Sequence, residues 1–366
     1  MVSELLENND NLRIMESLVS GESVVINYSE LGRRLSKNRG TIQERVERLI
    51  ENNIIMPPSF PFNYLFTAYP LLLLTNMDIP DCVECQPRIR QWIMDDPKII
   101  AAYKFRQGEY GTLIFTLHRN LKEAHEWLSV LPHILENDYG VEKEHATFNS
   151  NTIYISNELL LKYDPSTGIN ILERDIRKGD LCLKGHCIDQ LDVSILRYLL
   201  TGKGIKYNRN RVTQTTGLHN RTVEKRVNQM LKEKILLEPV CRFPELFMPP
   251  GYLLSYMLVH LEYPMNSGLN SLLINENIPI IWKTIHSKYN LLMFHIHTDL
   301  HDLYGDIDVN RESYKILEKA QARYLAYNSL KGFSPKKLSL HYIESKIKQN
   351  QDKEKKQGIN TQGDSP

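Results

Sequence analysis

Apolar residues repeat with a helical period in two segments of the chain that align on each other without gaps. The segments read TIQERVERLIENNII (Thr41–Ile55) and TVEKRVNQMLKEKIL (Thr222–Leu236). Both carry apolar residues at i, i+4, i+7 and i+8, which predicts one buried helix face in each. The matching residues are Ile42, Val46, Leu49 and Ile50 in the first segment and Val223, Val227, Met230 and Leu231 in the second. The chain therefore contains an internal duplication.

Two shorter helical patterns precede each of these segments. YSELGRRLSK and NRNRVTQTTGL lie directly upstream, separated from the longer helices by tight turns at residues 36–39 and 217–220. A further helix is expected before each, at Leu12–Val19 and Leu191–Leu200. Three helices with a short turn before the last one form the plan of a helix-turn-helix.

The pattern changes after each third helix, where prolines interrupt apolar residues in IIMPPSFPF and LLEPVCRFPELFMPP. Proline cannot continue a helix, so we expect a wing or a linking strand there. Both copies then follow the order βαββαβ, which is typical of a ferredoxin-like domain. The expected elements are Tyr64–Thr75, Val83–Met94, Lys98–Arg106, Thr112–His118, Lys122–Asn137 and Val141–Phe148, then Tyr252–Tyr263, Gly268–Asn277, Ile280–Ser287, Leu291–Thr298, Glu312–Arg323 and Tyr324–Leu330.

The sequence thus predicts an α+β protein with two winged helix-turn-helix domains, each followed by a βαββαβ ferredoxin-like domain. The expected order is a first winged helix-turn-helix (1–58), a first ferredoxin-like sensor or dimerisation domain (59–150), a linker (151–189), a second winged helix-turn-helix (190–248), a second ferredoxin-like domain (249–332) and a basic tail (333–366). Because the end of the chain, KQNQDKEKKQGINTQGDSP, lacks apolar residues to bury, we expect the tail to be disordered.

Composition narrows the class of protein. The 366 residues are 42% hydrophobic and 24% charged, with a net charge of +1, as in a soluble protein with several small cores. The longest apolar run, within FTAYPLLLLTN, is far shorter than the roughly 20 residues that span a membrane. The first residues show no secretory signal. Five cysteines spread over the chain favour free thiols in the reducing cytoplasm.

Two strings resemble a known family. YSELGRRLSKNRGTIQERVERLIENNII is similar to the DNA-binding helices of the Lrp/AsnC (leucine-responsive regulator) family, and YKFRQGEYGTLIFTLHRN is similar to the central hairpin of its sensor domain. The resemblance covers about 12–148 and 190–330. It implies a tandem regulator that binds double-stranded DNA and pairs through the sheets of its sensor domains, within one chain or in a homo-oligomer.

The resemblance also implies a small-molecule effector near the central hairpin. The family tends to place a Gly and, three residues later, an Asp beside its amino-acid pocket. The first copy has Gly108 and Gly111 at these places, and the second has Ser287 and Asn290. The candidate effector residues are Gly108, Tyr110, Gly111, Ser287 and Asn290.

Charge distinguishes the two copies as DNA readers. Residues 1–56 hold 7 Lys and Arg against 9 Asp and Glu, whereas residues 190–242 hold 11 against 4. Because DNA phosphates attract cations, the second copy is expected to supply most of the affinity. The first copy would contribute through the start of its third helix, or serve assembly. Candidate DNA contacts are His219, Asn220, Arg221, Thr222, Lys225, Arg226, Gln229 and Lys232, and in the first copy Lys37, Asn38, Arg39, Thr41, Arg45 and Arg48.

Other candidate chemistry lies in cysteines and histidines. Cys82 and Cys85 form a C-x-x-C, and Cys182 and Cys187 flank His186. Zinc, a thiol switch and inert cysteines are all open, and inert cysteines are favoured. FHIHTDLH places His295 and His297 on one strand face, with His301 and His286 nearby. A metal or tetrapyrrole pocket there competes with ordinary buried histidines, which are favoured.

The sequence therefore predicts a sequence-specific DNA-binding transcriptional regulator without a catalytic site, bound metal or cofactor. Two alternatives remain open. The first is a tetrapyrrole enzyme, because siroheme decarboxylases resemble the same combination of domains. The second is a ligand-binding assembly protein whose helix-turn-helix units no longer bind DNA.

Overall fold

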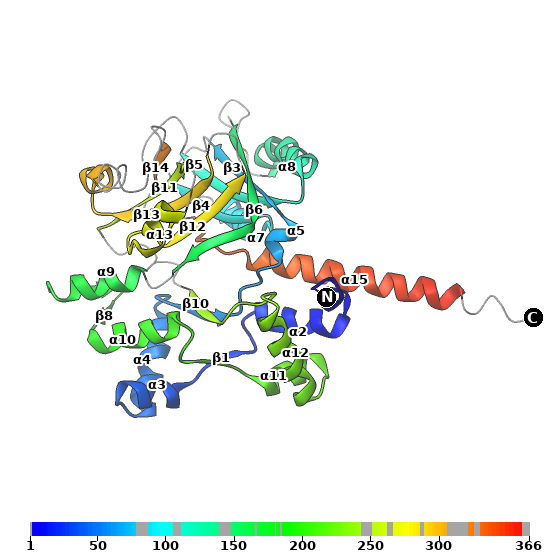
Figure 1. The fold of residues 1–366 in the computed structure, drawn as a ribbon, viewed down its shortest axis with the longest axis horizontal. Helices are drawn as coiled ribbons and strands as arrows, with labels where there is room; N and C mark the ends of the chain where they lie inside the picture. Colours follow the sequence, from blue (N-terminus) through cyan, green and yellow to red (C-terminus); the bar gives the residue numbers. More distant parts are fainter. Residues whose placement is uncertain are drawn as a thin grey trace, which may run out of the picture.

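A computed structural model shows two helical heads beneath a β-sheet layer (Figure 1). It describes residues 2–77, 87–104, 111–138, 148–164, 167–179, 181–183, 185–242, 251–261, 266–285, 289–305, 321–325 and 330–360. The α+β class is confirmed, with two units that each combine a winged helix-turn-helix and a ferredoxin-like half.

The helices of the two copies follow the same order along the chain. The first copy contains α1 (Val2–Glu7), α2 (Asn9–Val19), β1 (Val24–Ile26), α3 (Tyr28–Leu35), α4 (Arg39–Glu51) and β2 (Met56–Ser59). The second contains α10 (Gln190–Leu200), β9 (Ile205–Tyr207), α11 (Arg209–Thr216), α12 (Asn220–Lys232) and β10 (Val240–Arg242). The recognition helices α4 and α12 bury Ile42, Val46 and Leu49, and Val223, Val227 and Met230, as their apolar period predicts.

The two copies exchange their first helices. α10 packs on α3 and α4, whereas α2 packs on α11 and α12 (Figure 1). The Arg34 guanidinium on α3 lies 5.5 Å from the centre of the Tyr198 ring on α10. Gly204, just after α10, lies so close to Leu31 that an added Cβ would stand 2.4 Å from a Leu31 methyl group. Each complete head therefore combines helices from both of the expected segments, 1–58 and 190–248.

Short strands join the heads across the exchange. β1 pairs with β9 in antiparallel fashion, from Val24↔Tyr207 to Ile26↔Ile205. The proline-containing segments that were expected to form wings pair with each other, because β2 is antiparallel to β10. These pairings satisfy backbone groups of both copies at once, so neither copy completes its own head.

One sheet of eight strands lies above the heads, in the order β14-β11-β13-β12-β6-β3-β5-β4. The strands of the first half are β3 (Leu71–Met77), β4 (Ile99–Lys104), β5 (Thr112–His118) and β6 (Phe148–Tyr163). Those of the second half are β11 (Leu253–Val259), β12 (Ile280–Ile285), β13 (Leu291–His297) and β14 (Gln321–Leu325).

β6 joins the two halves of the sheet. It pairs with β3 from Leu71↔Tyr154 to Met77↔Phe148, and with β12 from Ile280↔Tyr163 to Ile285↔Tyr154. The expected linker at 151–189 is wrong at this point, because its first part is the central strand of the sheet. Asparagines and serines interrupt the apolar residues of this strand, FNSNTIYISNELLLKY, so its sequence shows no sustained strand period.

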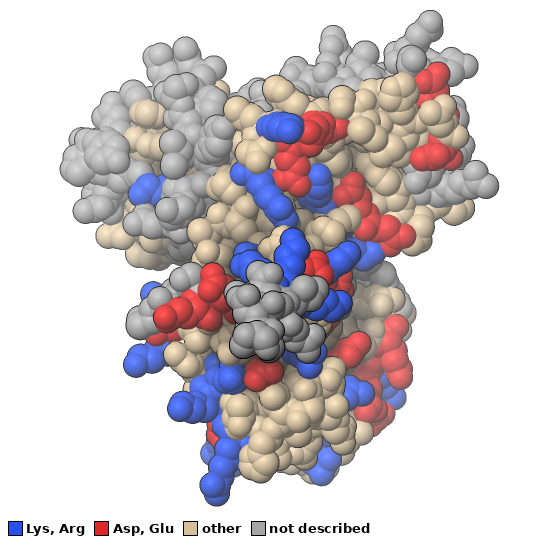
Figure 2. Space-filling model, turned by 90° about the vertical axis from the view of Figure 1, so that its right-hand side faces the viewer, with Lys and Arg blue, Asp and Glu red and all other residues tan. Residues whose placement is uncertain are grey.

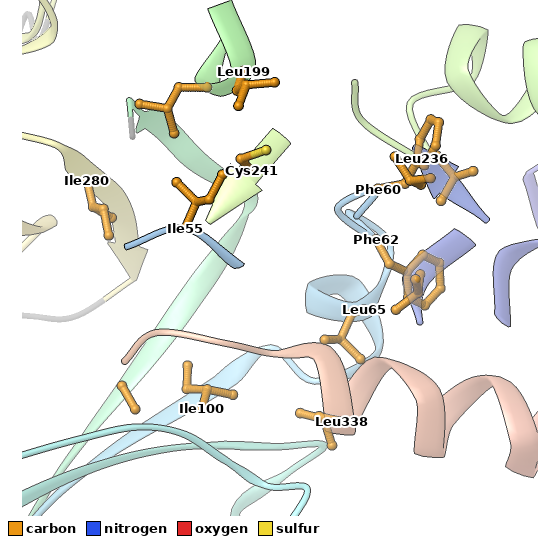
Figure 3. Packing of buried hydrophobic residues seen from close by; sticks show 14 of the residues in the cluster. Ile55, Phe60, Phe62, Leu65, Ile100, Leu199, Leu236, Cys241, Ile280 and Leu338 are labelled. Atoms are coloured by element: carbon orange, nitrogen blue, oxygen red, sulfur yellow. The ribbon is translucent and has the colours of Figure 1, made fainter. Parts of the chain in front are cut away.

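The two halves of the sheet face each other around a common core. Phe115 on β5 lies 6.1 Å from Tyr256 on β11 and 5.7 Å from Phe294 on β13, measured between ring centres. Helices α7 (Pro87–Asp95) and α8 (Leu121–His133), the latter followed by the π-helix η1 (Ile134–Asp138), cover the outer face of the first half, and α13 (Asn266–Ile274) covers that of the second. The same core continues into the heads, where Ile55, Leu199 and Cys241 meet (Figure 3).

Each half of the sheet continues into a helix that braces a head. α9 (Thr167–Ile176) follows β6 and packs on α10, and α15 (Lys336–Asn360) follows β14 and packs on α2. The segment expected as a linker also contains a hairpin after α9, formed by β7 (Leu181–Leu183) and β8 (His186–Ile188). Lys331 lies beside β4, because its backbone and that of Ala102 exchange two hydrogen bonds of 2.8 and 2.9 Å.

The expectation of a disordered tail from residue 333 is wrong for α15. Leu338, Tyr342 and Ile343 are buried in the main core, and Asn350 Nδ2 donates to the Glu7 carbonyl at 2.7 Å. Most of the lysines of α15 are exposed, namely Lys337, Lys348, Lys353, Lys355 and Lys356, so a short apolar stripe suffices to dock the helix. Residues 361–366 lie outside the described part.

Smaller differences concern element boundaries. The segment expected as one strand at Tyr64–Thr75 begins with the helical turn α5 (Leu65–Ala68), and β3 starts only at Leu71. Residues 321–323, expected at the end of a helix, belong to β14. In the described part of the chain, no helix has the length and apolar character needed to cross a membrane.

We predict that Ile343→Ala, at a fully buried position of α15, lowers the free energy of unfolding by about 2–4 kcal/mol, because it leaves a cavity against the core. Lys348→Ala, on the exposed side of the same helix, is the matched control and leaves stability within about 0.5 kcal/mol. Urea unfolding followed by circular dichroism measures both. Equal effects of the two substitutions would mean that α15 is not docked.

Candidate nucleic-acid interface

The recognition helix α12 turns a cationic face to solvent. His219 is its N-cap, with Nδ1 accepting the backbone N–H of Arg221 at 3.3 Å. Side chains on the opposite side from the buried stripe are exposed, and they are Arg221, Lys225, Gln229 and Lys232. Thr222 is half-buried beside them. Four of the predicted contacts therefore share an accessible face that offers cations to phosphates and an amide to base edges.

Asn220 has a local structural contact. Its Oδ1 accepts the Thr213 hydroxyl at 2.7 Å, and its Nδ2 donates to Asn210 at 3.4 Å. These bonds tie the start of α12 to α11 and fix the turn of the helix-turn-helix. The exposed cations that follow are presented from a fixed helix start.

Arg226 does not belong to the outer face. Its guanidinium donates to Asn8 Oδ1 at 2.8 Å and to Asn11 Oδ1 at 2.6 Å, and lies 3.6 Å from Asp10 Oδ2. These residues cap and begin α2, the helix received from the other copy. Arg226 therefore holds the exchanged helix, and its prediction as a DNA contact is replaced by this role.

Arg45 makes the equivalent contact in the other head. It donates to Asp189 Oδ1 at 2.9 Å and to Asp192 Oδ1 at 3.0 Å, at the start of α10. Partial burial raises the pKa of Asp189. Hydrogen bonds from backbone N–H groups and from Arg45 outweigh this effect and hold the pKa below its usual value. Arg45 is likewise a clasp for an exchanged helix. The sequence showed both arginines but not their partners.

The outer face of α4 is mixed in charge. Lys37, Asn38 and Arg39 are exposed at its start, where Asn38 Oδ1 accepts the backbone N–H of Thr41 at 2.8 Å. Further along, Arg48 is paired with Glu44 at 2.8 Å. The exposed carboxylates on this face are those of Glu44, Glu47 and Glu51. The exposed cations that no carboxylate of this helix pairs with thus lie at the first turn of α4 and just before it, whereas Arg48 is exposed but paired.

The exchange alters the charge balance of the heads. Residues 28–55 and 189–203, around α3, α4 and α10, hold eight Lys and Arg against six Asp and Glu. Residues 2–21 and 208–236, around α2, α11 and α12, hold the same numbers. The two copies of the repeat differ in net charge along the sequence, but the two complete heads do not. The difference persists between the recognition helices, with four cations against one anion in α12 and three against three in α4.

Figure 2 looks onto the side of the molecule that carries the head of α2, α11 and α12. Lys and Arg side chains gather along one edge of its lower part, and Asp and Glu gather along the opposite edge. The charge of this head is thus divided between two sides, which gives an anionic partner a preferred orientation.

The candidate effector residues are only partly described. Gly108, Tyr110 and Ser287 lie outside the described residues, and Gly111 directly precedes β5. Asn290 donates to the Leu261 carbonyl and accepts the Leu261 N–H, both at 2.8 Å. Both ends of its side-chain amide therefore hold the end of the β11 segment against β13.

Two buried histidines occupy matching positions that the sequence repeat did not single out. His118 pairs with Leu71 at the end of β5, and His297 pairs with Leu253 at the end of β13. Burial lowers the pKa of each imidazole to about 4, so both are neutral near pH 7. His118 Nε2 lies 2.9 Å from the Thr116 hydroxyl. His295 and His297 share one strand face as predicted, with ring centres 5.6 Å apart.

The cysteines divide into three groups. Cys82 and Cys85 lie outside the described residues. Cys182 and Cys187 form a disulfide, so the expectation of free thiols is wrong for this pair. Cys241 is buried between the heads and the sheet (Figure 3), and burial raises the pKa of its thiol to about 12. Within the described ranges, no three His, Cys, Asp or Glu side chains come together as a metal site.

No protein-family model and no curated protein matches this sequence. Among solved structures, the chain is similar to the siroheme decarboxylase NirDL, with 10% identity and a TM-score of 0.44 over 93% of this chain and 99% of that one. A complex of NirDL with an iron-uroporphyrin III analogue gives 9% identity and a TM-score of 0.45. AsnC from E. coli is 19% identical with a TM-score of 0.26, over 40% of this chain and 90% of that one.

Proposed function

We propose that this protein is a double-stranded DNA-binding regulator in which α12 is the main reading helix. The observation that carries the proposal is the exposed cationic face of α12, on a helix whose opposite face and whose Arg226 are both engaged with the rest of its head. Cations on a helix that is already held in place neutralise DNA phosphates and release counterions, and the helix backbone has little conformational freedom left to lose. Gln229, in the same face, offers the donor and acceptor pair that recognises adenine.

The proposal gives α4 a secondary part. Lys37 and Arg39 can reach phosphates near its first turn, while Glu44 and Glu47 would be repelled further along the groove. A small-molecule effector and pairing of whole chains belong to the same proposal, as the Lrp/AsnC resemblance implies them.

We predict that Lys225→Glu weakens binding to a duplex at least about tenfold and lowers the slope of log affinity against log salt by about one or more, because a phosphate contact is replaced by repulsion. Glu44→Lys changes the matching position of α4 and is the control, with an expected change below about twofold. Fluorescence anisotropy with a labelled duplex at several salt concentrations measures both. Unchanged affinity in the Lys225 variant contradicts the proposal.

A second candidate function is a tetrapyrrole enzyme of the siroheme-decarboxylase type. It is favoured by the adjacent buried imidazoles of His295 and His297, since imidazole nitrogens bind metals and haem iron and the lowered pKa of His297 keeps that ring neutral. In that case the head domains would serve assembly, and loss of Lys225 would leave activity intact.

We predict, on the second candidate, that the full chain incubated with siroheme and desalted retains a Soret band, and that His295→Ala shifts or removes it. His125→Ala, which alters an exposed histidine of α8, is the control and leaves the band unchanged. A protein that retains no Soret absorbance after incubation contradicts this candidate and leaves DNA binding as the function to test.

A further inference from the structure

The clasp on α4 is built around one buried carboxylate. Asp192 in the first turn of α10 is fully buried, and its Oδ1 accepts the Arg45 guanidinium at 3.0 Å. Its Oδ2 lies 3.1 Å from His186 Nε2 and accepts the backbone N–H of Asp189 at 3.4 Å. A buried carboxylate is tolerated where its hydrogen bonds are made. His186 is therefore a positioning residue for Asp192 and, through it, for Arg45.

His186 is held in place by a covalently closed hairpin. β7 and β8 pair in antiparallel fashion, with Cys182 opposite Cys187 in this register, and the two cysteines form a disulfide. Both cysteines are exposed, whereas His186, next to Cys187 in the strand, is turned toward α10 and half-buried. Alternate strand residues point to opposite faces, so one face of β8 meets solvent while the other meets the clasp.

We propose that Cys182–Cys187 is a redox-responsive modification site that controls how firmly α4 is held against α10. An exposed disulfide is open to exchange with a dithiol reductant. Reduction breaks the S–S bond and forms two cysteine thiols, while the reductant gives up two electrons and two protons and becomes a disulfide. Two paired strands of three residues are marginal without a cross-link. In the reduced protein His186 leaves Asp192 more often, and the Arg45 clasp loosens.

The other head offers a built-in comparison. Arg226 binds the side-chain amides of Asn8 and Asn11 and lies 3.6 Å from the partly exposed carboxylate of Asp10. Losing one hydrogen bond costs these groups less free energy than it costs the fully buried carboxylate of Asp192. The start of α2 is also braced by α15, through Asn9 and Glu354 at 3.3 Å. Reduction is therefore expected to affect the start of α10 and to leave the start of α2 unchanged. The inference concerns the fold and does not depend on the proposed DNA binding.

Hydrogen–deuterium exchange on the full chain tests this inference. The probe is a water-soluble phosphine, which reduces the disulfide and takes up oxygen from water as it becomes the phosphine oxide. Amides of residues 189–196 are expected to exchange about tenfold faster after reduction, the size of losing one hydrogen bond to a charged group. Amides at the start of α2 keep their rates.

Two variants separate the switch from general damage. The double variant Cys182→Ser with Cys187→Ser is expected to have the exchange rates of the reduced protein at 189–196, and the phosphine should not change them. His186→Ala is expected to speed exchange at 189–196 with the disulfide intact. Equal rates at 189–196 in oxidised and reduced protein would overturn the inference. So would an unlinked cysteine pair in air-oxidised protein, as shown by alkylation and mass spectrometry.

Discussion

Two arginines at matching places in the repeat fix the arrangement of this molecule. Arg45 and Arg226 each extend from a recognition helix to the first helix of the other copy. Each head is therefore completed by a segment that lies far away in the sequence. Among the acceptors of these arginines, Asp192 and Asn11 are buried, and a buried acceptor is costly when it lacks a donor. Separating the two copies of the repeat would break both clasps and the β1–β9 pairing together.

The sheet is coupled to this exchange through its last strands. β6 and β14 end the two ferredoxin-like halves, and the chain that follows each of them forms a brace on a head. α9 is fixed to α10 through Arg197 and Asn170 at 2.9 Å, and α15 is fixed to α2 through Asn350. The continuous core in Figure 3 connects the sheet to the heads, so the brace helices and the core together fix the heads relative to the sheet.

Local patterns in the sequence were sufficient for the helices and most strands, because the helical and strand periods report burial on one face of each element. They did not reveal the exchange, since Leu12 and Val193 present the same stripe whichever copy they pack on. β6 was missed because Asn and Ser residues interrupt its apolar residues, so its pairing with β3 and β12 shows only in the structure. In α15 the three buried residues Leu338, Tyr342 and Ile343 are outweighed in composition by lysines.

The candidate site was predictable in part. The exposed face of α12 follows from its period, so Lys225 and Gln229 could be placed from sequence alone. Arg226 looks equally suitable in the sequence, and its diversion to α2 depends on the exchange. The disulfide could not be distinguished from free thiols, because spacing alone does not bring Cys182 and Cys187 into register across a hairpin.

A double-mutant cycle between Arg45→Ala and Asp192→Asn tests the exchange most directly. If the first helices are exchanged, the two substitutions have a coupling energy of about 0.5–3 kcal/mol in urea unfolding, as contacting residues do. Arg226→Ala and Asp192→Asn should then be additive within about 0.5 kcal/mol, because they lie in different heads. The reverse result, with Arg226 coupled to Asp192 and Arg45 independent of it, would contradict the account.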